Sequence, residues 1–284
     1  MISTAGRLPN FPAVTFSNPQ SVLITGASSG IGLATARLLV ERGYRVAGTC
    51  RHPDAISGAE FPLIAMDQSD PEAVERGFAQ ARALLGPIDI LINNAGSGEL
   101  GAVEDTPAAF TRRLFEVNYF SAVQLTRLCL PEMRTRGAGV IVQLGSIVHS
   151  LQFPFKAQYC ASKSALSGFT LALRHEVKPF GIRVHLLEPG WVRSAFHARL
   201  KPLTPPGSAY ADRLRQFTDY ARDSDPRVID GEGVGRIILE ALENPKAPVR
   251  IAVGADARKF FRVSRFLSHY LLDKILGWKL ARKR

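Results

Sequence analysis

The feature that most constrains the fold is a glycine-rich turn between a short apolar run and an amphipathic segment near the N-terminus. The run Ser21–Thr25 is apolar enough for a buried strand, and apolar residues recur at helical spacing over 31–42. Between them lies Thr25-Gly-Ala-Ser-Ser-Gly-Ile-Gly32, whose glycines allow a tight turn and a close approach of a ligand to the backbone. This order of strand, turn and helix predicts a dinucleotide phosphate site at the helix N-terminus.

The rest of the chain repeats the alternation of strands and helices. The sequence predicts further strands at 44–49, 61–66, 87–92, 139–144, 182–187 and 249–253, and helices at 71–85, about 107–134 and about 157–178. Strands that alternate with helices of ten or more residues favour a parallel sheet covered by helices on both faces. Because no Pro/Gly-rich linker divides the chain, we predict one doubly wound α/β domain, a three-layer Rossmann fold, over residues 20–254.

The two termini differ from this domain in composition. Residues 1–19 contain three prolines and no apolar stretch of the kind found in secretory signals, which predicts an N-terminal arm. Residues 255–284 place apolar and basic residues at helical spacing, with nine Lys or Arg against two Asp, a net charge of +7 out of +11. The other residues carry only +4, which argues against a nucleic-acid-binding protein.

The predicted basic amphipathic helix at 255–284 has two alternative roles. It packs its apolar stripe on the domain or on a partner subunit, or it makes a peripheral membrane contact through 256–284. No apolar run approaches the roughly 20 residues needed to cross a bilayer. Three cysteines (Cys50, Cys129 and Cys160) have neither metal-ligand spacing nor a disulfide pattern. We therefore predict a cytoplasmic protein without a metal site, with peripheral membrane association as the alternative.

The end of the second predicted strand indicates which dinucleotide binds. Arg51 follows this strand, 19 residues after Gly32, and the nearest carboxylate, Asp54, lies beyond Pro53. An acidic residue at this point would bind the ribose 2′-hydroxyl of NAD, whereas an arginine accommodates the 2′-phosphate of NADP. We predict NADP(H) as the cofactor, with NAD as the alternative.

Tyr159 and Lys163 lie four residues apart on a predicted helix, so their side chains project from the same face. An ammonium beside a phenol favours the phenolate, which lowers the phenol pKa. A tyrosine in that position can give or take a proton at a carbinol oxygen. The spacing alone occurs by chance in many helices, so it needs support from other parts of the chain.

That support comes from four motifs in a fixed order. They are Thr-Gly-x-x-x-Gly-Ile-Gly at 25–32, Asn-Asn-Ala-Gly at 93–96, Ser146, and Tyr-x-x-x-Lys at 159–163. With them the chain resembles the short-chain dehydrogenase/reductase family, in its compact single-domain branch, over about residues 20–255. The tail is similar to extensions in retinol and 17β-hydroxysteroid dehydrogenases. The resemblance also implies a homodimer or homotetramer built on the two long helices.

The resemblance implies a catalytic role for Asn118, Ser146, Tyr159 and Lys163. Tyr159 would be the general acid in reduction and the base in oxidation, and Ser146 would hydrogen-bond the substrate oxygen. Lys163 would bind the nicotinamide ribose and keep the tyrosine pKa low. Asn118 would hold a water that links Lys163 to solvent.

Further cofactor contacts follow from the same resemblance. Asp67 would meet the adenine amino group, Asn94 and Ala95 the adenosine side, and the segment 189–194 the nicotinamide carboxamide, with Ser194 in place of a threonine. The complete set of expected cofactor contacts is Gly26, Ser28, Ser29, Gly30, Ile31, Gly32, Arg51, Asp67, Asn94, Ala95, Tyr159, Lys163, Pro189, Gly190, Val192 and Ser194.

The substrate site is expected between the loop 147–156 and a lid at about 191–228. The expected contacts are Ser146, His149, Leu151, Phe153, Phe155, Tyr159 and Trp191. Their large apolar side chains favour an apolar, bulky ketone or alcohol of a steroid, retinoid or acyl-chain type. His149 either contacts this substrate or is an ordinary loop histidine.

These observations predict an NADP(H)-dependent oxidoreductase that interconverts a ketone or aldehyde and an alcohol, with Tyr159 as general acid/base. One alternative is an NAD-dependent alcohol dehydrogenase of the same fold. Another is a sensor or scaffold that binds the dinucleotide without turnover, although all four catalytic positions are filled.

Overall fold

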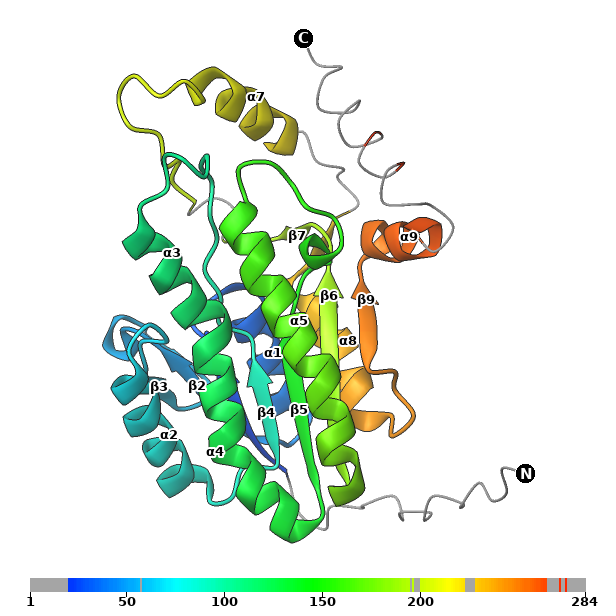
Figure 1. The fold of residues 1–284 in the computed structure, drawn as a ribbon. Coiled ribbons are helices and arrows are strands. Elements are labelled where there is room, and N and C mark those ends of the chain that lie inside the picture. Colours follow the sequence, from blue (N-terminus) through cyan, green and yellow to red (C-terminus); the bar gives the residue numbers. More distant parts are fainter. Residues whose placement is uncertain are drawn as a thin grey trace, which may run out of the picture.

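A seven-stranded parallel sheet forms the centre of the protein, in the order β3-β2-β1-β4-β5-β6-β9 (Figure 1). The computed structural model describes residues 20–56, 58–194, 196, 200–222, 228–264, 271 and 274. The strands of the sheet are β1 (Ser21–Thr25), β2 (Arg45–Cys50), β3 (Leu63–Ala65), β4 (Ile90–Asn93), β5 (Gly139–Leu144), β6 (Ile182–Pro189) and β9 (Arg250–Val253). The predicted doubly wound α/β fold is confirmed.

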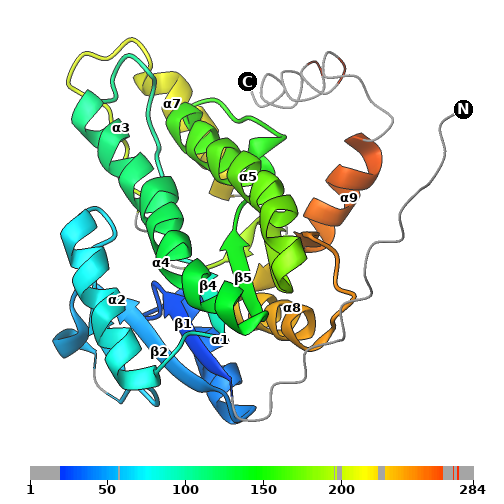
Figure 2. The same cartoon turned by 60° about the horizontal axis from the view of Figure 1, so that its bottom comes forward.

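Helices cover both faces of the sheet, as Figures 1 and 2 show. Val22 and Ile24 of β1 face α1 (Gly30–Glu41) and α8 (Gly231–Glu243), whereas Leu23 faces the opposite layer. That layer consists of α2 (Pro71–Leu85), α4 (Ser121–Arg136) and α5 (Ala157–Val177). Side chains alternate between the faces of a strand, so these fully buried strands appear in the sequence as continuous apolar runs.

The strand order reverses between β1 and β4. The chain moves outward from β1 to β3 and then returns to place β4 on the other side of β1. In open α/β sheets, ligands bind outside the carboxyl ends of the strands where the order reverses. The glycine-rich turn follows β1 and the Asn-Asn-Ala-Gly motif includes the end of β4, so both motifs meet at this point.

The predicted long helix from about 107 to 134 is present but is not uniform. It consists of α3 (Ala108–Phe115), a π-helical turn (η2, Glu116–Phe120) and α4. The π-helical turn contains Asn118, which the sequence had placed in an ordinary helix. Such turns are rare and occur often at functional sites.

Two strands begin two or more residues later than predicted. β3 spans Leu63–Ala65 rather than 61–66, so Asp67 lies two residues beyond the strand instead of closing it. β4 begins at Ile90 rather than at 87. The residues before Ile90 bond Ser21 instead, whose hydroxyl donates to the Pro87 carbonyl oxygen and whose backbone N–H donates to the Asp89 carboxylate.

The lid segment contains α7 (Ala211–Arg222), in agreement with the one short helix that the sequence predicts there. The two ends of the segment pair as the short strands β7 (Val192–Arg193) and β8 (Ile229–Asp230), which the sequence did not reveal. Short 3-10 turns occur at Pro53–Ala55 (η1), Ile147–His149 (η3) and Lys178–Phe180 (η4).

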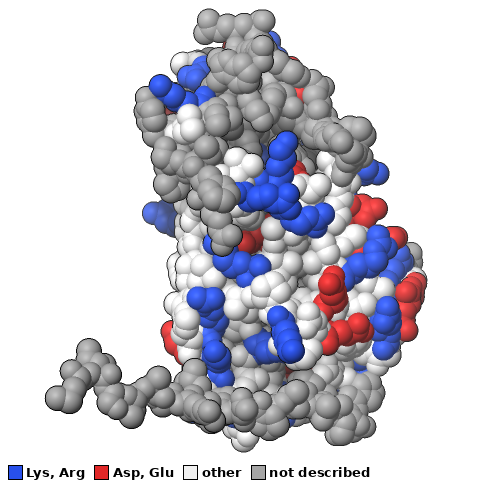
Figure 3. Space-filling view, turned by 90° about the vertical axis from the view of Figure 1, so that its right-hand side faces the viewer, with Lys and Arg blue, Asp and Glu red and all other residues white. Residues whose placement is uncertain are grey.

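The described part of the C-terminal segment is α9 (Ala255–Ser264), which begins directly after β9. It exposes the basic side chains Arg258, Lys259 and Arg262 and packs Phe261 on Arg250, with 5.0 Å between the guanidinium carbon and the ring centroid. Lys and Arg outnumber Asp and Glu on the face shown in Figure 3.

The predicted arm at 1–19 and the predicted helix beyond 264, apart from residues 271 and 274, lie outside the described residues. In the part of the chain that the structure describes, no helix is long and apolar enough to cross a membrane.

Candidate active site

Hydrogen bonds tie the glycine-rich turn to the end of β4. The Thr25 hydroxyl oxygen accepts hydrogen bonds from the backbone N–H groups of Asn94 and Ala95, at 3.0 and 2.9 Å. The Asn94 side-chain amide in turn donates to the carbonyl oxygens of Thr25 and Gly26, at 2.8 and 3.2 Å. These bonds fix the position of the turn after β1 relative to the loop after β4.

Three glycines of the turn serve two purposes. Gly26 and Gly30 have φ angles of +69° and +58°, a region that side chains disfavour. Gly32 has an ordinary φ angle, but a Cβ atom there would overlap the Gly26 carbonyl oxygen and crowd the Asn94 amide. Gly32, expected as a cofactor contact, does not line the cavity described below, and its lack of a side chain lets α1 pack against the turn.

A cavity of about 590 Å³ opens at the carboxyl ends of the strands. Most of the expected site residues line it, although they come from segments far apart in the sequence. These are Gly26, Ser28, Ser29, Gly30, Ile31, Arg51, Asp67, Asn94, Ala95, Ser146, Phe153, Tyr159, Lys163, Pro189, Gly190, Trp191, Val192 and Ser194. Gly32, Asn118, His149, Leu151 and Phe155 are not among the described residues that line it.

Three of the expected catalytic residues meet inside this cavity. Tyr159 and Lys163 lie one turn apart on α5, with the Lys163 ammonium 6.0 Å from the Tyr159 ring centroid. The Tyr159 hydroxyl hydrogen-bonds with Ser146, which follows β5 and caps the short η3 turn. Lys163 is 4% exposed and donates a hydrogen bond to the Leu144 carbonyl oxygen at 2.8 Å.

The pKa of Tyr159 differs from the expectation based on spacing. Burial raises the pKa of this phenol to about 12, although the hydrogen bond with Ser146 acts in the opposite direction. Burial lowers the pKa of Lys163 to about 8. The predicted lowering of the Tyr159 pKa is therefore wrong for this structure, because desolvation is the largest influence on the phenol.

Asn118 lies beside the cavity and links three elements. Its side-chain oxygen accepts a hydrogen bond from the Ser97 N–H at 2.7 Å. Its amide nitrogen donates to the Ser97 carbonyl oxygen at 2.9 Å and to the Ser162 hydroxyl at 3.0 Å. The side chain therefore joins the π-helical turn to the loop after β4 and to α5, which leaves its expected role of holding a water untested.

The outer end of the cavity carries both signs of charge. Arg51, just after β2, is exposed and lines the cavity. Burial opposes ionisation of Asp67, but hydrogen bonds from Ser69 and the charges of Arg113 and Arg51 lower its pKa below the usual value. Asp67 accepts hydrogen bonds from the Ser69 N–H and hydroxyl at 2.9 and 2.7 Å, which fix the orientation of its carboxylate.

The expected substrate contacts in the loop 147–156 do not all reach the cavity. Phe153 and Trp191 line the cavity, as expected. Phe155 has a φ angle of +62° and packs on Phe217 of α7, with 5.7 Å between ring centroids. Phe155 and the partly buried Leu151 were expected to contact substrate but do not line the cavity, and for Phe155 the left-handed backbone explains why.

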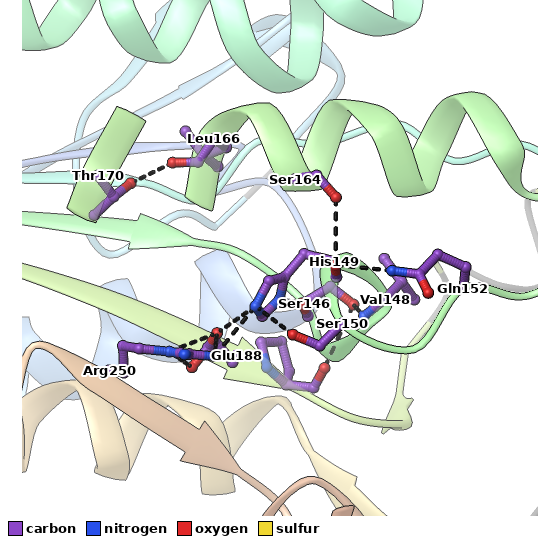
Figure 4. A network of polar contacts seen from close by, with 11 residues as sticks. Ser146, Val148, His149, Ser150, Gln152, Ser164, Leu166, Thr170, Glu188 and Arg250 are labelled. Carbon is purple, nitrogen blue, oxygen red and sulfur yellow. Dashed lines mark hydrogen bonds and ion pairs between the residues drawn. The ribbon is translucent and has the colours of Figure 1, made fainter. Parts of the chain in front are cut away.

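His149 belongs to a polar network behind Ser146 (Figure 4). One ring nitrogen lies 2.8 Å from the Ser146 carbonyl oxygen, and the other lies 3.1 Å from a carboxylate oxygen of Glu188 and 3.2 Å from Arg250. Arg250 also donates to both oxygens of Glu188, which is 1% exposed. Because these groups occupy both ring nitrogens, the structure favours a supporting role for His149 over a substrate contact.

Sequence reasoning missed three charged residues around the cavity. Glu99 is 1% exposed and accepts hydrogen bonds from the Tyr159 N–H at 3.0 Å and the Thr106 hydroxyl at 3.3 Å. Asp256 accepts a hydrogen bond from the Trp191 N–H at 2.7 Å, and a Cβ atom at Gly190 would overlap its carboxylate. Lys156 directly precedes α5 and lines the cavity.

Only one of these three residues carries a signal in the sequence itself. Lys156 is a lone charge in the aromatic run Phe153-Pro-Phe155, which could have marked it as unusual. Glu99 and Asp256 bond residues 60 and 65 positions away along the chain, so local patterns do not reveal them.

Comparisons with known proteins agree on one family. The family model described as short chain dehydrogenase matches residues 20–203. The chain is 40% identical over 271 residues to a probable short-chain type dehydrogenase/reductase, VdlC, of Helicobacter pylori, which covers 92% of this chain and 98% of that protein. It is 32% identical over 264 residues to a 3-ketodihydrosphingosine reductase of Bacteroides thetaiotaomicron, covering 92% of this chain and 97% of that protein.

A solved structure is similar over the same length. A short-chain dehydrogenase from Burkholderia cenocepacia in complex with NADP aligns with a TM-score of 0.73 and 25% identity. The alignment covers 91% of this chain and 98% of that chain.

Proposed function

Because this chain belongs to the short-chain dehydrogenase/reductase family, we propose that it is an NADP(H)-dependent oxidoreductase that interconverts a ketone or aldehyde and an alcohol on an apolar substrate. The observation that carries the proposal is that one cavity joins the glycine-rich turn to Ser146, Tyr159 and Lys163. A phosphate site and a proton-transferring tyrosine in a single cavity are what a nicotinamide-dependent reaction requires.

The residues present fit a nicotinamide dinucleotide. Gly26 and Gly30 place no side chain at the turn, and the N-terminus of α1 offers backbone N–H groups and a positive dipole end to phosphates. The cavity extends from Arg51 and Asp67 at one end to Lys163 at the other. In the proposed complex, Arg51 and Asp67 hold the adenosine end, and Lys163 and Ser194 hold the nicotinamide end.

The proposed chemistry needs little from the protein beyond placement and one proton. When bound, the nicotinamide supplies or accepts the hydride. Ser146 orients the substrate oxygen by a hydrogen bond, and Tyr159 gives its proton to that oxygen during reduction or removes it during oxidation. With its pKa raised by burial, the Tyr159 phenol is protonated at neutral pH, which is the form that gives a proton in reduction.

The preference for NADP(H) rests on Arg51 at the ribose end. Its guanidinium suits a 2′-phosphate, and charge-assisted bonds from arginine to phosphate are strong and directional. The complex of the Burkholderia relative with NADP also supports this choice. NAD remains the alternative cofactor.

The cavity wall beyond Tyr159 supports an apolar substrate. Aromatic and aliphatic side chains from the loop after η3 and from the lid line this part, namely Phe153, Trp191, Phe196, Leu200, Leu203 and Phe217. One relative is named a 3-ketodihydrosphingosine reductase, which supports a keto group as the reacting centre in this chain too.

A second subunit is part of the proposal, as a homodimer or homotetramer. Phe120, which directly precedes α4, and Phe180, in the η4 turn after α5, are 49% and 44% exposed. The proposal of a second subunit rests on membership of the family, and a partner that packs on the helical layer of α4 and α5 would cover both side chains. Light scattering of the purified chain at several concentrations tests this assembly, and a monomer at all of them would contradict it.

The function is tested with a panel of carbonyl compounds and both cofactors in parallel. The panel contains apolar ketones and aldehydes of increasing size together with hydrophilic sugars, and absorbance follows cofactor oxidation. We expect turnover of apolar carbonyls with NADPH, and at least about 10-fold lower kcat/KM with NADH, from the lost phosphate contact. Equal rates with NADH would support the NAD-dependent alternative. Absence of turnover with both cofactors would contradict the proposed function.

A further inference from the structure

Lys156 places an ammonium in the apolar half of the cavity. It lies three residues before Tyr159, at the start of α5, and is 7% exposed. The preceding residue, Phe155, has the left-handed φ angle of +62°, and the Gly101 N–H donates to its carbonyl oxygen at 3.0 Å. This fixed bend directs Phe155 away from the cavity, whereas Lys156 lines it.

Within the described residues, the ammonium of Lys156 has one aromatic contact. Its ammonium lies 5.5 Å from the centroid of the Trp191 ring, within the range of a cation–π interaction. Among the residues that the structure describes, none accepts a hydrogen bond from this ammonium. A buried cation that faces a cavity without an acceptor costs free energy, and a ligand that supplies the acceptor recovers it.

Glu99 is the nearby carboxylate, but other donors use its oxygens. They accept hydrogen bonds from the backbone N–H groups of Gln158 and Tyr159 and from the Thr106 hydroxyl. Burial lowers the pKa of Lys156, while the charges of Glu99 and Cys160 act in the opposite direction. Glu99 therefore favours the charged form of Lys156 without occupying its donors.

We propose that Lys156, stacked on Trp191, is a specificity residue that binds an anionic oxygen group of the substrate beside the reacting carbonyl. This inference deepens the proposed function and rests on it. Lys156 is the N-cap of α5, three residues before Tyr159, and both side chains line the same cavity, so the proposed anionic group lies near the carbonyl at Tyr159. Phe153, Phe196 and Leu200 line the same cavity and cover the hydrocarbon part of the substrate.

The substrate class is therefore an apolar keto compound with a carboxylate or phosphate near the ketone. A carboxylate or a phosphate accepts a charge-assisted hydrogen bond from the ammonium, which is stronger than a neutral one. An amino ketone would place a second cation against Lys156, and like charges at short range are repulsive.

The test compares 4-oxodecanoate with its methyl ester in NADPH-dependent reduction. The wild-type protein is expected to have a kcat/KM about 10- to 100-fold higher for the acid than for the ester. Lys156→Met should remove this preference, and Lys156→Arg should retain most of it. Lys201→Met is the matched control, because Lys201 also lines the cavity but is exposed, and this variant should keep the preference. A preference for the acid that persists in Lys156→Met would overturn the proposal.

A binding measurement separates this proposal from the proposed function. Decanoate, decyl phosphate and methyl decanoate are titrated into the wild-type protein and into Lys156→Met by calorimetry, with NADP present. We expect about 10-fold or greater loss of decanoate or decyl phosphate affinity in Lys156→Met, and a smaller change for the ester. The stronger of the two anionic ligands identifies the group. If no carbonyl compound is reduced but this loss occurs, the proposed function fails and the anion site stands. Equal decanoate affinity in folded wild-type protein and Lys156→Met would overturn the anion site.

Discussion

The two halves of the cavity are built in different ways. The sheet-edge half consists of residues at the carboxyl ends of β1, β2, β4 and β5 together with Tyr159 and Lys163 of α5, and hydrogen bonds between side chains and backbone hold it. The lid half consists of the loop 147–156 and the described part of 191–222. The buried cluster on which it packs has only three members among the described residues, namely Leu214 and Phe217 of this half and Leu100 of the loop after β4.

We infer from this difference that the sheet-edge half carries the chemistry of the reaction and that the lid half selects the substrate. The sheet-edge half is anchored in the two large apolar clusters that fill both faces of the sheet. The lid half has few buried apolar contacts, and segments of that kind open at low free-energy cost. We therefore expect substitutions in the first half to change folding and catalysis, and substitutions in the second to change substrate affinity.

The largest effect is expected from Tyr159→Phe. Removal of the proton donor should lower kcat by about 10²- to 10⁴-fold, because general acid–base catalysis contributes this much. NADPH binding, measured by fluorescence titration, should weaken far less. Tyr44→Phe is the control, because Tyr44 does not line the cavity. Wild-type turnover in Tyr159→Phe would show that the sheet-edge half does not supply the proton.

Lys163 should make stability depend on pH. Burial lowers its pKa from 10.5 to about 8, so between these values the unfolded chain binds more protons than the folded one. The free energy of unfolding should then rise with pH across this window, by about 3 kcal/mol in total.

Denaturation with urea at about pH 7.5 and pH 10 measures this dependence on pH. The rise should be absent in Lys163→Met and present in Lys178→Met, since Lys178 is exposed. An identical rise in wild-type protein and Lys163→Met would assign it to other groups.

Gly32→Ala should disturb the sheet-edge half without touching a ligand. The added Cβ would overlap the Gly26 carbonyl oxygen, and such overpacking costs about 1–3 kcal/mol. Thermal unfolding should show a lower Tm, and NADPH affinity should fall because the turn is displaced. Gly168→Ala adds the same atom on α5 where nothing lies within 4 Å, so its Tm should stay equal or rise. Equal Tm values for both variants would contradict the close packing described.

Arg51→Asp should change cofactor choice with little effect on folding. Loss of a charge-assisted contact is expected to weaken NADPH by about 2 kcal/mol, or roughly 30-fold, and NADH much less. Parallel titrations with both cofactors measure the ratio, and Arg112→Asp provides a control outside the residues that line the cavity. Equal losses of affinity for NADPH and NADH would contradict a contact between Arg51 and the 2′-phosphate.

The smallest effect is expected from Phe217→Ala in the lid half. This residue is 5% exposed and packs on Phe153 and Phe155. Because the described part of the lid half has few buried apolar contacts, we expect KM to rise about fivefold, or about 1 kcal/mol, while Tm and NADPH affinity change little. A Tm loss as large as that of Gly32→Ala would show that the lid is part of the main core, and the contrast between the halves would fail.

The sequence predicted the sheet-edge half well, because its signals are local. The turn at 25–32 and the spacing of Tyr159 and Lys163 depend on residues within one strand, turn or helix. Ser194 and Gly190 were also placed at the cavity by a short motif. The Tyr159 pKa was predicted in the wrong direction, since spacing reveals a neighbouring charge but not the desolvation around it.

The lid half was predicted less well, because its geometry depends on distant contacts. Phe153 and Phe155 are equivalent by composition, yet only Phe153 lines the cavity, since the bend at Phe155 is held by Gly101. His149 was ambiguous in the sequence, and only the fold brings Glu188 and Arg250 to its ring. The π-helical turn around Asn118 has no local signal that we recognise.

The central claim is that a hydride passes from the cofactor to a carbonyl carbon in this cavity, and an isotope label tests it most directly. A carbonyl compound found in the substrate panel is reduced with NADPH that carries deuterium on the transferable position of C4, and mass spectrometry locates the label in the alcohol. The account predicts one deuterium on the carbinol carbon, with the hydroxyl proton coming from Tyr159 and ultimately from solvent. Reduction without deuterium on that carbon would contradict hydride transfer in this cavity and the proposed function with it.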